Sequence, residues 1–267
     1  FTPKPAYEML RSLVGSEMCI RDSVEMLHID DVQRKDLQAR LQLMQDSDMT
    51  ILCLPDEVAR DAVALAEGDA SIRFIDASTA HRVDNDWVYG FPEMTATQRG
   101  MIASASRIAN PGCYPTGFLA LAKPLIASGM LLADSRLSVP AVSGYSGGGK
   151  SMIGAHDGGE LAPQFSYGTS LSHKHLAEMT HYAGLTTPPI FMPSVGDFYA
   201  GMLVHLPLHV DQFAGKVEAN QLYQIYADWY ATAPLVRMGA ARASDENTPK
   251  MLNTFRTHSE NLSLIHI

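Results

Sequence analysis

The sequence is short of cysteine, of long apolar runs and of positive charge, and each shortage excludes a class of protein. Three cysteines, at positions 19, 53 and 113, provide neither a disulfide framework nor a cysteine-built metal site in 267 residues. No run reaches the roughly 18 apolar residues that a transmembrane helix needs. A net charge of −9 argues against a nucleic-acid partner. An acidic chain can still bind an anionic substrate through local arginines and helix N-termini.

Both ends of the chain read differently from its middle. Residues 1–23 include Arg11-Ser-Leu-Val-Gly-Ser-Glu-Met-Cys-Ile-Arg-Asp-Ser23, and the chain closes on Leu262-Ser-Leu-Ile-His-Ile267. The leader has no sustained apolar core and no small-residue cleavage site, so it does not read as a signal peptide. We expect residues 1–23 to be a non-native leader, residues 251–267 to hold a truncated return segment with a non-native tail, and the protein to be soluble and cytosolic.

Between these ends, the first part of the chain has the pattern of a parallel sheet. Short apolar strands are expected at 24–29, 49–54, 72–76 and 107–109, alternating with helices at 32–44, 56–66 and 95–105. Such alternation implies right-handed crossovers in an α/β fold. The prediction is a Rossmann-like domain over residues 24–112, with ligands gathering beyond the carboxyl ends of its strands.

The texture then changes to more glycine, proline and methionine. Strands are expected at 137–143, 190–194 and 203–210, and helices at 117–128, 172–182 and 216–231. This pattern predicts a mixed, mainly antiparallel sheet covered by helices, in an α+β domain over residues 113–250.

Cys113 stands at the start of the first of these helices. Pro111 and Gly112 cannot continue a helix, so the cysteine falls in the cap or the first turn. Backbone N–H groups and the positive dipole end there stabilise a thiolate, and such sites lower a thiol pKa from about 8.5 to roughly 3.5–7.5. The alternative is that Cys113 is a small buried apolar residue, which is the commoner role of a lone cysteine.

The segment Asn110-Pro-Gly-Cys-Tyr-Pro-Thr-Gly117 resembles the active-site signature of the N-acetyl-gamma-glutamyl-phosphate reductases, in their shorter variety. Four more segments resemble that family, in its order: Asp76-Ala-Ser-Thr-Ala-His-Arg82, Trp87-Val-Tyr-Gly-Phe-Pro-Glu93, Ser143-Gly-Tyr-Ser-Gly-Gly-Gly-Lys150 and Pro188-Pro-Ile-Phe-Met-Pro-Ser-Val-Gly196. The likeness covers roughly residues 24–210. It implies a fold of the glyceraldehyde-3-phosphate-dehydrogenase kind, in which the second domain carries catalysis and dimerisation, and a homo-oligomer.

The resemblance also implies a reaction, in which NADPH reduces N-acetyl-L-glutamyl 5-phosphate to the semialdehyde, with release of phosphate, in arginine biosynthesis. Cys113 would be the nucleophile that forms a thioester, and His173 its acid-base partner. The residues expected to bind the acyl-phosphate substrate are Ser78, Arg82, Asn110, His175 and Glu178. The alternative for the histidines is a decorated helix surface, and for Arg82 a solvated side chain.

Cofactor contacts are expected from the glycine-dense turn after residue 143 and from one arginine near the first strand: Ser143, Gly144, Ser146, Gly147, Gly148 and Arg34. Exposed N–H groups of such a turn can form an anion-binding nest. No Gly-x-Gly-x-x-Gly turn precedes residue 24, and that loop would normally seat the pyrophosphate. NADP is therefore expected from the resemblance, and weak NADPH binding is expected of the chain as written.

Three other interpretations remain open on the sequence. The first is the neighbouring aspartate-semialdehyde dehydrogenase, which shares the Cys-His mechanism but embeds its cysteine in different residues. The second is a non-catalytic binding module that keeps the fold without the cofactor. The third, a metal site at His173-Lys-His175, lacks a fixed carboxylate or cysteine companion, so no metal is expected.

Overall fold

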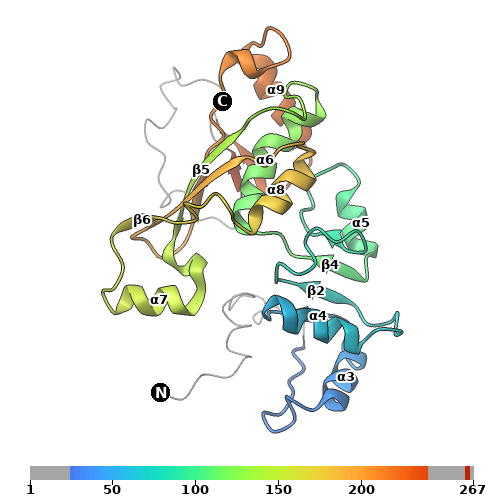
Figure 1. Ribbon diagram of the computed structural model, residues 1–267. Helices are drawn as coiled ribbons and strands as arrows, with labels where there is room; N and C mark the ends of the chain where they lie inside the picture. The colour runs from blue at the N-terminus through green and yellow to red at the C-terminus, as the bar shows by residue number, and fades with distance from the viewer. Residues whose placement is uncertain (1–24, 240–261, 265–267) are drawn as a thin grey trace. The chain divides into compact units, whose positions relative to one another are not determined.

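The computed structural model describes residues 25–239 and 262–264 and divides the chain into two compact units. One unit comprises Phe1–Pro92 and Thr97–Pro111, and the other Glu93–Ala96 and Gly112–Ile267. Each is described by itself below, with its elements as labelled in Figure 1. Within the described residues, none of the helices has both the length and the apolar character that a membrane span requires.

The first unit is built on a parallel sheet of four strands in the order β1-β2-β4-β3. The strands are β1 (Thr50–Leu52), β2 (Phe74–Asp76), β3 (Val88–Tyr89) and β4 (Arg107–Ala109). The helices of this unit are α3 (Leu37–Gln45), α4 (Asp56–Leu65) and α5 (Gln98–Ser104). The expected parallel α/β architecture is thus confirmed.

Helix α4 contributes a face of small residues to the core of this unit. Ala59 and Ala62 are fully buried, and they belong to the same cluster as Phe74 of β2 and Trp87. Small side chains let the helix lie close to the strands, so that large side chains such as Phe74 fill the space. Burying one such side chain stabilises the fold by about 1.5–3 kcal/mol.

The strand expected at 24–29 is wrong in its described part. Residues 25–30 form no strand, and a turn follows at 31–35. Asp30 makes that turn, since its carboxylate accepts the N–H of Val32 and its carbonyl accepts the N–H of Gln33. Helix α3 then begins five residues later than expected, because Asp36 caps it by accepting the N–H groups of the second and third helical residues.

The second unit is built on a mixed sheet of four strands in the order β6-β7-β5-β8. The strands are β5 (Ser138–Gly144), β6 (Gln164–Ser166), β7 (Ile190–Gly196) and β8 (Met202–Val204). Strands β5 and β7 run parallel, whereas β8 and β6 are antiparallel to their neighbours. The mixed sheet is confirmed, but it is not mainly antiparallel, because its longest pairing, β5 with β7, is parallel. Strand β8 also ends well before the expected residue 210.

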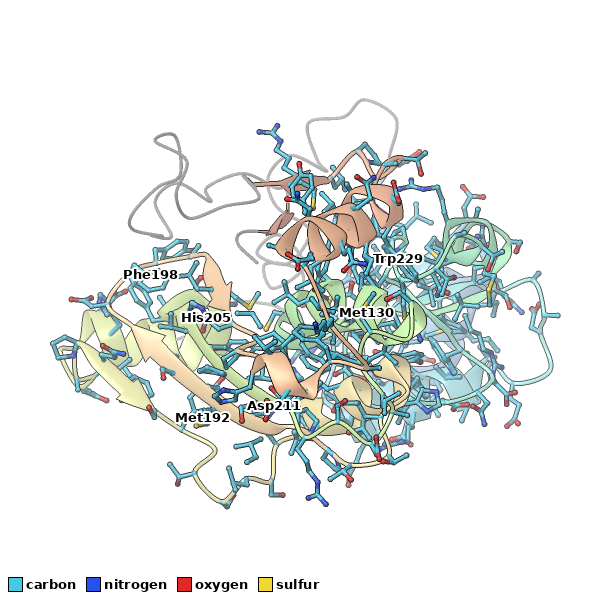
Figure 2. All side chains as sticks on the ribbon, turned by 90° about the horizontal axis from the view of Figure 1, so that it is seen from above. Met130, Met192, Phe198, His205, Asp211 and Trp229 are labelled. Atoms are coloured by element: carbon cyan, nitrogen blue, oxygen red, sulfur yellow. The ribbon has the colours of Figure 1, made fainter. Side chains whose placement is uncertain are left out.

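Helices α6 (Cys113–Ala127) and α8 (His175–Ala183) lie side by side on one face of this sheet (Figure 1). Helix α9 (Ala219–Trp229) packs on α6, where Tyr230 just beyond it donates to the carbonyl of Ala120 at 2.8 Å. Trp229, the last residue of α9 (labelled in Figure 2), donates from its indole N–H to the carbonyl of Glu93 at 3.1 Å.

The remaining elements complete the second unit. They are the 3-10 helix η1 (Tyr145–Gly148), helix α7 (Gly149–Asp157), the 3-10 helix η2 (Val210–Gln212), and the parallel pair β9 (Val236–Met238) and β10 (Leu262–Leu264).

Candidate active site

Cys113 is the first residue of helix α6, as the sequence predicts. Gly112 is the N-cap, with extended backbone angles of φ −65° and ψ 145°. The Cys113 side chain is exposed and forms no disulfide. The thiol therefore lies where the helix dipole favours negative charge, in reach of a reagent from solution.

The helix that carries Cys113 packs closely on the sheet. A Cβ at Gly117 would lie 2.7 Å from Cγ2 of Val204 on β8, so only glycine fits there. The next residue, Phe118, is fully buried. This packing fixes the first turn of α6 over the covered face of the sheet.

Aromatic and imidazole rings surround the start of both helices. Phe191 of β7 is the centre: its ring centroid lies 5.1 Å from the rings of Tyr114 and His173, and 6.4 Å from that of His175. The two imidazole centroids are 4.6 Å apart. The His-x-His segment predicted from the sequence is therefore packed beside the residue that follows Cys113.

His173 has a defined hydrogen-bonding role for one ring nitrogen. Its Nδ1 atom receives the backbone N–H of His175 at 3.1 Å. A backbone N–H can only donate, so Nδ1 is an acceptor, and the proton of the neutral ring lies on Nε2. Burial, followed by the nearby Lys174 charge, lowers the pKa of His173 below its ordinary value, which favours this neutral form near pH 7.

Two tyrosine hydroxyls lie in the same cluster and were missed by the sequence analysis. Tyr114 donates from its hydroxyl to the carbonyl of Ser194 at 3.1 Å. Burial raises its pKa, opposed by hydrogen bonds with Ser143 and Tyr167. Burial also raises the pKa of Tyr167, and the charges of Tyr114 and Cys113 add to that rise, so both phenols stay protonated.

Tyr167 lies beside the predicted acid-base residue, since its ring centroid is 5.8 Å from that of His173. The charge of Cys113 is among the causes that raise the pKa of the Tyr167 hydroxyl. Only tertiary structure brings it there, because it lies 54 residues from the cysteine and six from the histidine, with no motif to mark it. The segment Gln164-Phe-Ser-Tyr167 offered one weak signal, a short run with alternate apolar residues.

Glu178 and His175 lie three residues apart on helix α8, and both are buried. Glu178 is 1% exposed and His175 6% exposed. Oε2 of Glu178 accepts the N–H of Gly112 at 2.8 Å. The two side chains share one helix face, as the spacing predicts, and that face lies against the start of α6.

The glycine-dense turn after β5 is held by its own chain. The N–H groups of Gly144, Tyr145 and Ser146 donate to carbonyls of Gly201, Phe198 and Tyr199 at 2.9–3.0 Å. A Cβ on Gly144 would lie 2.5 Å from the carbonyl oxygen of Tyr199. These three N–H groups are therefore engaged within the protein, and a ligand would meet this turn at other atoms.

Within the first unit, the loop after β2 is ordered by a buried carboxylate. Asp76, with no exposed surface, accepts the N–H of Ser78 at 2.9 Å, its hydroxyl at 2.7 Å and the Nδ1 atom of His81 at 2.7 Å. His81 stacks on Trp87 with ring centroids 4.2 Å apart. In the same loop, Nη2 of Arg82 donates to the carbonyl of Ala77 at 3.0 Å, and the side chain is 8% exposed.

The other predicted residues of the first unit lie at separate places. Asn110 follows β4 directly, and its N–H donates to the carbonyl of Asp76 at 2.8 Å. Arg34 lies in the exposed turn at 31–35, with Lys35 beside it.

Burial, with the nearby charge of Asp76, raises the pKa of the Cys53 thiol, which makes that cysteine a poor nucleophile.

The described residues hold no group of three or more histidine, cysteine, aspartate or glutamate side chains that could bind a metal ion. The first unit has instead the architecture that binds a dinucleotide. Strands β1, β2 and β4 run parallel and so present their carboxyl ends at one edge, which is where such ligands bind. The exposed cations Arg34 and Lys35 suit a ribose 2′-phosphate.

Comparison with known proteins gives a consistent result over most of the chain. Residues 13–101 match the NAD binding domain of semialdehyde dehydrogenase, and residues 113–265 match its dimerisation domain. The chain is 44% identical over 233 residues to N-acetyl-gamma-glutamyl-phosphate reductase 2 from Nostoc sp., an alignment that covers 84% of this chain and 72% of the relative. It is 46% identical over 213 residues to the N-acetyl-gamma-glutamyl-phosphate reductase from Chelativorans sp., covering 79% and 68% of the two chains.

Solved structures add support for the fold. Aspartate semialdehyde dehydrogenase from Francisella tularensis superposes with a TM-score of 0.64, covering 96% of this chain and 84% of that one. The sequence identity is 12%, so this likeness concerns architecture alone.

Proposed function

Because the chain belongs to the N-acetyl-gamma-glutamyl-phosphate reductase family, we propose that it reduces N-acetyl-L-glutamyl 5-phosphate to N-acetyl-L-glutamate 5-semialdehyde and releases phosphate. The observation that carries this proposal is the exposed Cys113 thiol at the first residue of α6, packed in one unit with the His173 ring cluster. A thioester forms from an acyl phosphate by attack of a thiolate. The N-terminus of α6 stabilises the thiolate form of Cys113.

Cys113 performs the covalent step. Its thiolate attacks the acyl carbonyl, a carbon–sulfur bond forms, and the bond to the phosphate oxygen breaks to leave a thioester. N–H groups in the first turn of α6 can hydrogen-bond the oxygen on which charge develops. When bound, the nicotinamide cofactor supplies the hydride that reduces this acyl group to the aldehyde level.

His173 holds the proton that the reaction moves. Its Nδ1 atom is engaged by the N–H of His175, so Nε2 presents the donor of the neutral ring. We propose that this donor hydrogen-bonds the substrate oxygen in the charged intermediates. In this tautomer Nε2 already carries a proton and cannot accept one from the Cys113 thiol. Transfer to Nε2 therefore requires the other neutral tautomer, with the proton on Nδ1 and the hydrogen bond from the N–H of His175 broken.

Ser78, Arg82 and Asn110 of the first unit are proposed to bind the substrate. The buried network around Asp76 supports the loop of Ser78 and Arg82, and a guanidinium can hold a carboxylate or phosphate with two parallel hydrogen bonds. Asn110, three residues before Cys113, is the third member. His175 lies in the ring cluster and is proposed to border the acyl chain.

NADP is the proposed cofactor. Arg34 is placed in an exposed turn and is proposed to meet the 2′-phosphate. The Ser143 and Ser146 side chains and the backbone of Gly144, Gly147 and Gly148 are proposed to border the nicotinamide half. The N–H groups of residues 144–146 already donate to carbonyls of the protein. We therefore propose that this part of the turn contacts the cofactor by packing and does not bind an anion through those N–H groups.

A homo-oligomer is proposed on two grounds, which are the match to a dimerisation domain and the exposed apolar side chains on one face of strand β7. Ile190 and Met192 project from that face with 49% and 46% of their surface exposed (Figure 2 labels Met192). We also propose that the protein works in the reducing cytoplasm, since the reaction requires Cys113 as a thiol.

The proposal is tested by following NADPH oxidation and phosphate release together in the forward direction. N-acetyl-L-glutamyl phosphate should give one phosphate for each NADPH oxidised. Aspartyl phosphate is the matched competitor, because the aspartate semialdehyde dehydrogenases share the fold. A higher kcat/KM on aspartyl phosphate would contradict the proposed substrate while leaving the acyl-phosphate chemistry in place.

A further inference from the structure

The helix that carries Cys113 does not cap its own N-terminus. The first N–H groups of any helix lack partners within it, and a capping box supplies them from the N-cap side chain and from a glutamate or glutamine at the third helical position. In α6 the N-cap is Gly112, which has no side chain, and the third residue is Pro115. Helix α9 of the same unit shows the ordinary arrangement, with Glu218 and Gln221 in those two places.

Glu178 supplies the missing carboxylate from another helix. Its Oε2 atom accepts the N–H of Gly112 at 2.8 Å, the bond that a third-position glutamate would make. The side chain is 1% exposed, so this bond is sheltered from water. A charged acceptor in a buried place makes a strong hydrogen bond, and losing it would leave a buried N–H without its partner.

We propose that Glu178 is a positioning residue, which fixes the first turn of α6, and hence Cys113, against helix α8. This proposal deepens the proposed function and rests on it. Helix α8 also carries His175 at its first residue, preceded by His173, so a single carboxylate sets the nucleophile's helix in register with the histidines. At 1% exposure Glu178 is withdrawn from solution, so in this proposal it acts through Gly112 and takes the place of the substrate contact expected from the sequence.

The carboxylate also adds negative charge beside the helix N-terminus. A thiolate at Cys113 is stabilised by the dipole and opposed by such a charge. Glu178→Gln keeps an oxygen acceptor for the Gly112 N–H and removes the charge. Glu178→Met has similar length and removes both. The two variants therefore separate the hydrogen bond from the charge.

The first readout is alkylation of Cys113 by iodoacetamide in the substrate-free protein, resolved by peptide mass spectrometry over a series of pH values. Glu178→Gln should move the alkylation midpoint to lower pH, because the opposing charge is gone. Glu178→Met should change the alkylation rate more than Glu178→Gln does, because the first turn loses its anchor. Glu67→Gln, the same change at an exposed position after α4, is the matched control and should match wild type.

The second readout is steady-state kinetics. Glu178→Met should lower kcat by about 10²-fold, the cost of a misplaced reacting group, with KM nearly unchanged, and Glu178→Gln should recover most of that loss. If both variants raised KM and alkylated as wild type does, Glu178 would be a substrate contact and the proposal would fall. If Glu178→Met fails to fold, the alkylation midpoint of Glu178→Gln decides alone. An inactive wild type would remove the proposed function, whereas the alkylation result would still decide the role of Glu178.

Discussion

Cys113 and Cys53 show how position sets the chemistry of one side chain. Cys113 lies exposed at the positive end of a 15-residue helix. Cys53 follows strand β1, and burial with the nearby Asp76 charge raises its pKa. The environment of Cys113 therefore favours the thiolate, whereas that of Cys53 favours the neutral thiol.

We therefore expect a limiting amount of an alkylating agent to label Cys113 before Cys53. Cys113→Ser should abolish turnover with the fold intact, because a serine hydroxyl at this site is far less ionised than a thiol. Cys53→Ser should retain activity and alter mainly stability. Peptide mass spectrometry reads the labelling, and preferential labelling of Cys53 would reverse the assignment of the nucleophile.

The hydrogen bond at Nδ1 of His173 leads to a graded expectation for two variants. A glutamine amide can place an N–H near the position of Nε2, whereas an asparagine amide reaches only the position of Nδ1. His173→Asn should lower kcat by about 10²- to 10⁴-fold, the usual contribution of acid-base catalysis, and His173→Gln should lose less. Equal losses would show that proton transfer, and not donation from Nε2, is the essential role.

The pH dependence of kcat/KM tests the direction in which the pKa of His173 is shifted. Because burial lowers the pKa of His173, its neutral form persists below the ordinary histidine value. The acid limb of kcat/KM should accordingly lie on the acid side of that value in wild type, and it should be flattened in His173→Gln. An acid limb displaced to higher pH would contradict the lowered pKa of His173.

At the scale of elements, local signals predicted best where an element makes its own hydrogen bonds, as a helix does. The helix from Asp56 agrees with expectation, because its acidic first turn acts within the helix. The strand at Arg107–Ala109 also agrees, and it forms because β2 and β3 pair with it. Residues 25–30 carry a similar apolar pattern but form no strand, since a strand also needs a paired neighbour. Helix α7 was missed because its glycines, including Gly149 at φ +72°, are typical of turns.

The site residues also divide into those that local sequence signals indicate and those that contacts between distant residues bring together. Cys113 at a helix start, and His175 with Glu178 on one helix face, could be predicted from spacing alone. The hydrogen bond from Gly112 to Glu178 spans 66 residues, and no local pattern indicates it. Tyr167 was missed for the same reason.

The turn after β5 offers a test of why it is rich in glycine. Gly144→Ala should destabilise the protein by about 1–3 kcal/mol, because the new Cβ would strike the carbonyls of Phe198 and Tyr199 and break a backbone pairing. Gly154→Ala in α7 is the control, as nothing lies within 4 Å of its added Cβ, and it should be neutral or stabilising by about 1 kcal/mol. Thermal unfolding measures both, and equal effects would contradict the packing role of Gly144.

At the scale of the whole molecule, the two units divide the labour expected of the family. The first provides a parallel sheet, and the second a mixed sheet together with the proposed nucleophile and the histidines. Both sheet types were predictable, since the first has strands alternating with helices and the second clustered strands with changed composition. The strand order β1-β2-β4-β3 could not be predicted, because β3 is only two residues long and no sequence pattern marks it as a strand.

The exposed apolar side chains of strand β7 lead to an expectation about assembly. Met192→Glu should weaken or abolish the homo-oligomer, because it places a charge in a face that would be dry in the assembly. Met101→Glu is the control, at 48% exposure on α5 of the first unit. Sedimentation velocity reads the state, and an unchanged oligomer in Met192→Glu would place the interface elsewhere.

The central claim is that Cys113 forms an acyl-enzyme that phosphate, and not water, exchanges. The most direct measurement is oxidation of N-acetyl-L-glutamate 5-semialdehyde by NADP, with phosphate present or omitted. We predict that turnover requires phosphate and that Cys113→Ser is inactive under both conditions. Equal rates with and without phosphate would show hydrolysis of the thioester, and would contradict an acyl-phosphate reductase.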